Sequence, residues 1–273
     1  MPLQKDVPPA NGKDDAAKGL NMKLLQLADG IDVAYLGPPK EAGPLPAVFY
    51  FALSFEETLN LDPYNQPALY LSQFPLRVFS FDLPAHGPNL NAIDAIKVWA
   101  EQFEKGEDPL APFLEKVGAT LQSLIDRRWV LKEKIGLMGL SRGGLIASLV
   151  GASFPDIKAI SAFAPMTSLY GAKEFANIEE DLWRDQYDLS NHVDALCDKH
   201  FRFYIGNRDV RVSTERCMHL VSSLANKGFE KGLRSPPVEM IITPSIGHMG
   251  HGTSKETFEH GAHFLGKKLG VIR

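Results

Sequence analysis

Ser141 lies in a glycine-flanked sequence that could present its hydroxyl group for reaction. Gly139–Leu140–Ser141–Arg142–Gly143 follows the apolar run 135–138 and precedes a stretch with helical spacing. A sharp turn between a strand and a helix would lift the serine above a sheet. It requires glycine on both sides because a Cβ there would clash. The same turn would aim the main-chain N–H of Arg142 at the reacting group. The pattern predicts Ser141 as a nucleophile.

Two histidines near the C-terminus are candidates for the base that such a serine needs. Histidine suits this task because its ordinary pKa lies near neutral pH. His248 and His251 both follow the apolar run 238–242. We take His248, which follows a glycine soon after that run, as the base. His251 is the alternative base, and it could instead line the site.

Asp209 follows another apolar run, residues 201–205. If both runs are parallel strands, their carboxyl ends share one edge of a sheet, and Asp209 lies on the same rim as Ser141. A carboxylate there would orient the imidazole and stabilise its charged form. The alternative interpretation is an aspartate that only forms the turn after a strand.

The elements that must position these residues alternate along the chain. A hairpin is expected from residues 22–27 and 31–36, around the turn sequence Asp29–Gly30. The alternation predicts an α/β fold with a mostly parallel, doubly wound sheet. Strands are expected at 47–51, 76–81, 134–139, 157–163, 201–206 and 238–242, and helices at 67–74, 92–103, 112–127, 143–150 and 256–269.

The chain is expected to hold one large domain. Residues 1–20 are polar and predict a flexible N-terminal tail, and residues 21–273 form the domain. The spacing between strands is long at about 166–199, which predicts a small cap over the carboxyl ends of the strands. Phe175, Trp183 and Tyr187 in this segment could line an apolar pocket or pack in a core.

The composition excludes several classes of function. The net charge is −4, and no stretch combines basic and aromatic residues as a nucleic-acid groove would. The apolar runs are too short to span a bilayer. The first twenty residues lack the apolar segment of a signal peptide, and two cysteines make no disulfide framework, so we expect a cytoplasmic protein. His-x-x-His pairs at 248/251 and 260/263 lack the acids or cysteines that would complete a metal site, and we expect neither metal nor cofactor.

Taken together, these motifs resemble the α/β-hydrolase superfamily over residues 22–270. The resemblance rests on the hairpin, on Asp82–Leu83–Pro84–Ala85–His86–Gly87, on the Ser141 turn, on residues 206–212 and on Gly247–His248–Met249. The single-domain size is similar to esterases and to dienelactone-hydrolase-like or peptidase-like relatives. It implies a carboxylesterase-like serine hydrolase that cleaves a small-molecule ester, thioester or related acyl bond through an acyl-enzyme, with no cofactor.

One departure from the superfamily concerns the second donor of the oxyanion hole. The family usually carries His-Gly after the strand in question, whereas this chain has Ala52–Leu53–Ser54. By position the N–H of Ser54, or of Leu53 if the loop is offset, should serve. The altered loop leaves open a non-catalytic ligand-binding or scaffolding protein. An acyltransferase is a further alternative, because it would use the same triad.

Overall fold

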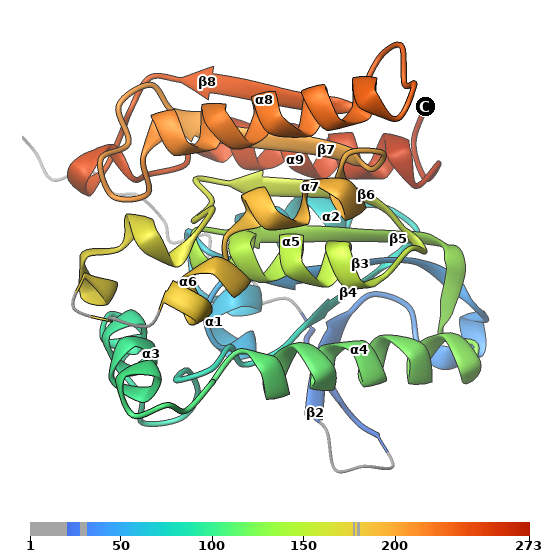
Figure 1. The fold of residues 1–273 in the computed structure, drawn as a ribbon. Coiled ribbons are helices and arrows are strands. Elements are labelled where there is room, and N and C mark those ends of the chain that lie inside the picture. Colours follow the sequence, from blue (N-terminus) through green and yellow to red (C-terminus); the bar gives the residue numbers. More distant parts are fainter. Residues whose placement is uncertain (1–20, 28–31, 177, 179–180) are drawn as a thin grey trace, which may run out of the picture.

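The computed structural model describes residues 21–27, 32–176, 178 and 181–273 (Figure 1). The tail predicted at residues 1–20 and the predicted Asp29–Gly30 turn lie outside the described residues. No helix in the described part of the chain is long and apolar enough to cross a membrane.

The described residues form a sheet of eight strands in the order β1-β2-β4-β3-β5-β6-β7-β8. The hairpin strands β1 and β2 pair antiparallel, β2 also pairs antiparallel with β4, and the remaining neighbours are parallel. This confirms the predicted α/β-hydrolase architecture with an N-terminal hairpin. The strands are β1 (Lys23–Gln26), β2 (Asp32–Leu36), β3 (Leu45–Phe51), β4 (Arg77–Ser80), β5 (Val130–Leu140), β6 (Ile157–Phe163), β7 (His200–Gly206) and β8 (Val238–Thr243).

Helices cover both faces of the sheet, and each face has its own buried apolar cluster. α4, α5, α7 and α8 lie on one face, while α1, α2 and α9 lie on the other (Figure 1). The helices are α1 (Phe55–Asn60), α2 (Gln66–Leu71), α3 (Ala95–Glu104), α4 (Ala111–Asp126), α5 (Arg142–Ser153), α6 (Asp181–Gln186), α7 (Val193–Leu196), α8 (Thr214–Glu230) and α9 (Lys255–Lys268). Short 3-10 turns lie at Lys40–Ala42, Leu169–Gly171, Lys173–Phe175, Leu189–His192 and His248–Gly250.

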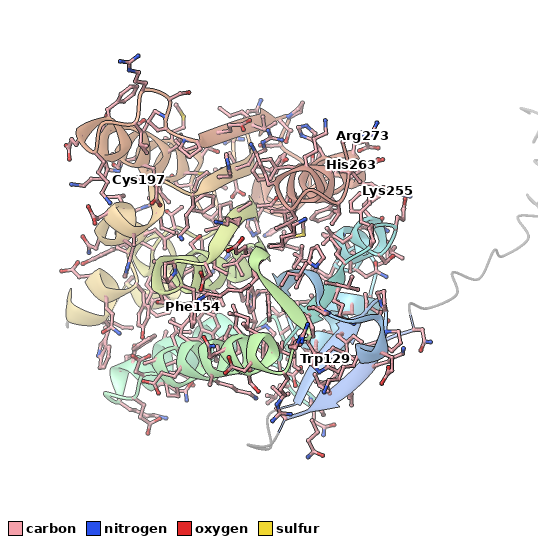
Figure 2. The ribbon with its side chains drawn as sticks, turned by 90° about the vertical axis from the view of Figure 1, so that its right-hand side faces the viewer. Trp129, Phe154, Cys197, Lys255, His263 and Arg273 are labelled. Atoms are coloured by element: carbon pink, nitrogen blue, oxygen red, sulfur yellow. The ribbon has the colours of Figure 1, made fainter. Side chains whose placement is uncertain are left out.

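Because most of the strands are parallel, the sheet has one side where the strands end and an opposite side where they begin. Their carboxyl ends point to the left in Figure 1, and the loops that follow β3, β5, β7 and β8 therefore meet there. Figure 2 looks onto the opposite edge, where Trp129, Phe154 and Cys197 lie shortly before the strands β5, β6 and β7 begin. The catalytic candidates all lie on the side where the parallel strands end.

The helix α8 is an element that we did not predict from the sequence. Its buried residues Cys217, Leu220 and Leu224 recur at spacings of three and four, which is the pattern of an amphipathic helix. Ser213 caps its start by accepting a hydrogen bond from the N–H of Arg216 at 3.2 Å. The signal is present in the sequence, but the polar character of the whole segment hides it.

Residues 166–199, where a cap was predicted, hold α6, α7 and three of the 3-10 turns. Phe103 of α3 contacts the rings of Phe175, Trp183 and Tyr187. Phe175 and Tyr187 are each 1% exposed, so these two rings pack in the core and do not line a pocket. The Tyr187 hydroxyl donates a hydrogen bond to Asp108 Oδ2 at 2.5 Å.

Candidate active site

Ser141 occupies a strained turn between β5 and α5. Its φ of 56° and ψ of −117° are unusual for a residue with a side chain, and such strain concentrates at functional sites. Its N–H donates to Phe163 O at 2.8 Å. A Cβ on Gly139 would lie 2.1 Å from Gly143 O, and one on Gly143 would lie 2.0 Å from Phe51 O. Glycine at both positions is therefore required for the turn to close.

His251 connects this serine to Asp209. Its Nε2 lies 2.9 Å from Ser141 Oγ, and its Nδ1 lies 2.7 Å from Asp209 Oδ2. A carboxylate accepts, so Nδ1 carries the proton and Nε2 is free to accept the hydroxyl proton of Ser141. The three side chains form one hydrogen-bonded chain from a carboxylate to a hydroxyl.

Asp209 is held firmly in the loop after β7. It is 2% exposed, and its Oδ1 accepts hydrogen bonds from the N–H groups of Arg211 at 2.9 Å and Val212 at 3.1 Å. Its own N–H donates to Thr214 Oγ1 at 3.0 Å, and that hydroxyl donates to Gly206 O at 2.7 Å. The carboxylate therefore cannot rotate away from His251 without breaking these bonds.

The preference for His248 over His251 is wrong. His248 is exposed and starts the short 3-10 turn His248–Gly250, where its carbonyl accepts the N–H of His251 at 3.0 Å. The positive φ values of Gly247 (74°) and Met249 (57°) reverse the chain after β8. This extra turn moves the residue that reaches Ser141 three positions along the chain.

The glycines that flank His251 are the signal that could have identified it. A Cβ on Gly250 would lie 2.2 Å from Arg208 O, and one on Gly252 would lie 2.8 Å from Ile246 O. His251 therefore lies where the loop after β8 makes close contact with the loop that carries Asp209. His248 also follows a glycine, but a Cβ on Gly247 would meet no atom closer than 3.3 Å.

The loop after β3 differs from the expectation for the oxyanion hole. Ser54 is the N-cap of α1, and its N–H donates to Glu57 Oε2 at 3.3 Å. The N–H of Leu53, the alternative donor, is bonded to Thr58 Oγ1 at 3.0 Å. Both N–H groups are thus already engaged inside the chain. The sequence carries the signal for this cap, Ser-x-x-Glu, which we did not recognise.

A pocket of about 160 Å³ opens beside Ser141 Oγ. It is lined by Ala52, Leu53, Tyr64, Leu140, Ser141, Arg142 and His251. The main-chain N–H of Arg142 begins α5, as predicted, and makes no hydrogen bond to the described residues. Sequence reasoning missed Tyr64, whose hydroxyl likewise makes no hydrogen bond within the described part of the chain. Two residues that line the pocket, Tyr64 and Arg142, therefore each carry a donor that is free of hydrogen bonds to the described residues.

His86 lies behind this pocket and holds the Arg142 side chain. Its Nδ1 lies 2.9 Å from Pro84 O, so Nδ1 is the donor and Nε2 accepts from Arg142 Nη1 at 3.2 Å. Burial lowers the pKa of His86 to about 4, and the Arg142 cation acts in the same direction. The neutral imidazole is the form that can accept this hydrogen bond.

Within the ranges that the structure describes, no group of three or more His, Cys, Asp or Glu side chains is arranged to hold a metal ion. Of the predicted His-x-x-His pairs, His251 is bonded to Asp209, and His263 Nδ1 is bonded to Glu259 O at 2.9 Å. Cys197 and Cys217 are buried and free.

The model of the prolyl oligopeptidase family matches residues 114–271, more than half of the chain. The chain belongs to this family. The matched region contains Ser141, Asp209 and His251 but not the loop after β3. Membership in the prolyl oligopeptidase family places the chain in the α/β-hydrolase superfamily, as its sequence motifs predicted.

Individual relatives of this family member are esterases and peptidases. Esterase YjfP of Escherichia coli (strain K12) is 25% identical over 220 residues, which are 74% of this chain and 84% of the esterase. The fold is similar to a Mycobacterium tuberculosis puromycin-hydrolyzing peptidase, with a TM-score of 0.65 and 16% identity. That match covers 92% of this chain but only 39% of the peptidase. An S-formylglutathione hydrolase from Agrobacterium tumefaciens matches with a TM-score of 0.60 and 17% identity, over 92% of this chain and 95% of the hydrolase.

Proposed function

We propose that this protein is a serine hydrolase that cleaves an ester, thioester or related acyl bond of a small molecule. The observation that carries the proposal is the hydrogen-bonded chain from Asp209 through His251 to Ser141. The same arrangement of groups performs acyl transfer in unrelated folds. The esterase and peptidase relatives support this reaction class.

The geometry allows the reaction to run in two stages. Ser141 Oγ attacks the acyl carbon while His251 Nε2 takes the hydroxyl proton, and Asp209 stabilises the imidazolium. The imidazolium then returns that proton to the leaving group, and an acyl-enzyme remains. Water attacks the acyl-enzyme, gives a proton to His251, and the carboxylic acid product leaves as Ser141 regains its hydrogen. No cofactor takes part in these steps.

Two donors would stabilise the negative charge on the acyl oxygen. One is the main-chain N–H of Arg142 at the start of α5, where the helix dipole also favours negative charge. We assign the second to the Tyr64 hydroxyl, because the N–H groups of Leu53 and Ser54 are bonded to Thr58 and Glu57. The Tyr64 hydroxyl would then replace the main-chain N–H of Ser54 or Leu53 that we expected in this role.

Labelling with a fluorophosphonate probe tests the proposed function. The folded protein should react covalently at Ser141 and hydrolyse 4-nitrophenyl butyrate. Ser141→Ala should abolish labelling, and His251→Gln should slow hydrolysis by about 10⁴-fold or more. His248→Gln is the matched control, because it removes a nearby exposed imidazole, and it should keep both reactions.

The outcomes separate this function from its alternatives. A folded protein that neither labels nor hydrolyses any ester, thioester or amide would contradict it. Labelling without turnover would indicate the binding protein, and an amide or ester product formed with an added amine or alcohol in place of the acid would indicate the acyltransferase.

A further inference from the structure

The Arg142 side chain is a half-buried cation without an anionic partner in the described part of the chain. Its Nη1 donates to Ala92 O at 2.7 Å and to His86 Nε2 at 3.2 Å, and both acceptors are neutral. Among the residues that the structure describes, no carboxylate lies within salt-bridge distance of it, and its Nε and Nη2 make no hydrogen bond. A partly buried charge of this kind has lost part of its hydration and would gain from pairing with an anion.

The charges around Arg142 do not supply that anion. Burial lowers the pKa of Arg142 to about 10, and the nearby Arg211 cation adds to the effect. Arg211 is itself paired with Glu174 through two hydrogen bonds, at 2.9 and 3.1 Å. Glu174 and Glu57 act on the pKa of Arg142 in the opposite direction, but Glu174 is paired with Arg211, and Glu57 Oε2 accepts from the hydroxyl and the N–H of Ser54. The guanidinium therefore remains available to a ligand.

Arg142 also lies between the reaction pocket and a second hollow. It lines the pocket that holds Ser141 and His251, and it lines an adjoining groove of about 300 Å³. Leu61, Leu90 and Ile93 form apolar walls of this groove and are 48%, 57% and 84% exposed. Large exposed apolar side chains that gather beside a reaction site are typical of a binding surface.

The groove lies away from His251, the residue that would protonate the leaving group. His251 must protonate the leaving group, so the leaving group departs on the side of His251. His251 lines the reaction pocket but not the groove, whereas Leu53, Tyr64 and Arg142 line both. An acyl chain extending from Ser141 can therefore enter the groove past the guanidinium.

We propose that the acyl group of the substrate is an aliphatic chain with a carboxylate, which pairs with the Arg142 side chain while the chain lies against Leu61, Leu90 and Ile93. The inference rests on the proposed function, because it takes Ser141 as the residue that is acylated. A guanidinium matches a carboxylate well, since both are planar and can form two parallel hydrogen bonds.

A pair of substrates that differ in one charge tests this inference. The 4-nitrophenyl monoesters of glutaric, adipic and pimelic acid carry a free carboxylate, and their methyl esters are neutral analogues of similar shape. The wild-type protein should hydrolyse the best charged ester with a kcat/KM about 10- to 100-fold above that of its neutral partner. Arg142→Gln should reduce this ratio to about one, and Arg142→Lys should keep part of it.

The ratio is informative because a structural effect of Arg142 on the His86 loop would slow both substrates alike. Arg208→Gln is the matched control, since it removes a positive charge from the loop beside Asp209 that does not line the groove. It should leave the ratio within about twofold of wild type. A wild-type ratio near one for all three chain lengths, or a ratio that survives Arg142→Gln, would overturn the inference.

A binding measurement keeps this test separate from that of the proposed function. Calorimetry on Ser141→Ala, which cannot be acylated at position 141, compares monomethyl adipate with dimethyl adipate. The monoester should bind at least about 10-fold more tightly, and the difference should vanish in Ser141→Ala/Arg142→Gln. If neutral esters are hydrolysed through Ser141 but charge has no effect on rate or binding, the inference alone fails. If charge affects binding but no ester is cleaved, the proposed function fails and only the pairing of Arg142 with a carboxylate stands.

Discussion

His251 Nδ1 lies 2.7 Å from Oδ2 of Asp209, whose other carboxylate oxygen is fixed by two main-chain N–H groups. This arrangement selects the imidazole tautomer with its proton on Nδ1. The unprotonated Nε2 then faces the Ser141 hydroxyl at 2.9 Å. The carboxylate thus determines which imidazole nitrogen can act as a base.

Replacing Asp209 by asparagine should expose this dependence. The Asp209→Asn side chain can keep its bonds to the loop N–H groups, but its NH₂ group would face Nδ1 and favour the wrong tautomer. We expect kcat to fall by about 10⁴-fold with little change in KM. Steady-state hydrolysis of 4-nitrophenyl butyrate measures this, with Asp126→Asn on α4 as a control that keeps full activity. A loss below 10-fold would contradict the role.

The sequence was sufficient to predict most of the strands that position Ser141, Asp209 and His251. Most of the parallel strands coincide with apolar runs of the sequence. Ser141 directly follows β5, and Asp209 lies three residues after the end of β7. The choice between His248 and His251 depended on a tertiary detail. The positive φ of Met249 cannot be read from residue type, and it decides which imidazole turns inward.

The loop after β3 shows a different limit of prediction from sequence. Position alone suggested Ser54 as an oxyanion donor, but the capping box with Glu57 uses its N–H to begin α1. This was predictable from local rules for helix starts. The position of Tyr64 in the lining of the same pocket was not predictable, because it depends on the path of the chain after α1.

Removing the Tyr64 hydroxyl should lower kcat if it serves the oxyanion. Loss of one such donor costs about 10²–10³-fold elsewhere, and we expect Tyr64→Phe to reduce kcat within about that range while KM changes little. The control is Tyr70→Phe on α2, a tyrosine that lines neither hollow beside Ser141. Unchanged kcat in Tyr64→Phe would indicate that the Leu53 N–H leaves Thr58 during reaction and acts as the donor.

Gly143, in the turn that carries Ser141, should be important for stability. A Cβ in Gly143→Ala would lie 2.0 Å from Phe51 O, so β3 and α5 would have to separate. We expect the free energy of unfolding to fall by about 3 kcal/mol or more. Urea denaturation followed by circular dichroism measures it. Gly171→Ala, whose Cβ would meet no atom closer than 3.5 Å, should change stability by less than about 1 kcal/mol.

Stability should also decrease in weak acid because of His86. Burial lowers the pKa of His86 in the folded protein from 6.5 to about 4, so between these values the unfolded chain binds a proton that the folded protein excludes. The free energy of unfolding should therefore fall as the pH drops from about 6.5 toward 4, by up to about 3 kcal/mol.

The variant His86→Gln isolates this contribution, because an amide can still donate to Pro84 O and accept from Arg142 without titrating. Urea unfolding at pH 7.0 and 5.0 should show a smaller loss of stability in His86→Gln than in wild type. The exposed His219 on α8 provides the control, and His219→Gln should keep the wild-type pH dependence. Equal pH dependence in His86→Gln and wild type would mean that His86 accepts its proton as readily in the folded protein as in the unfolded chain. In weak acid the Arg142 guanidinium would then lie beside a protonated, positively charged His86.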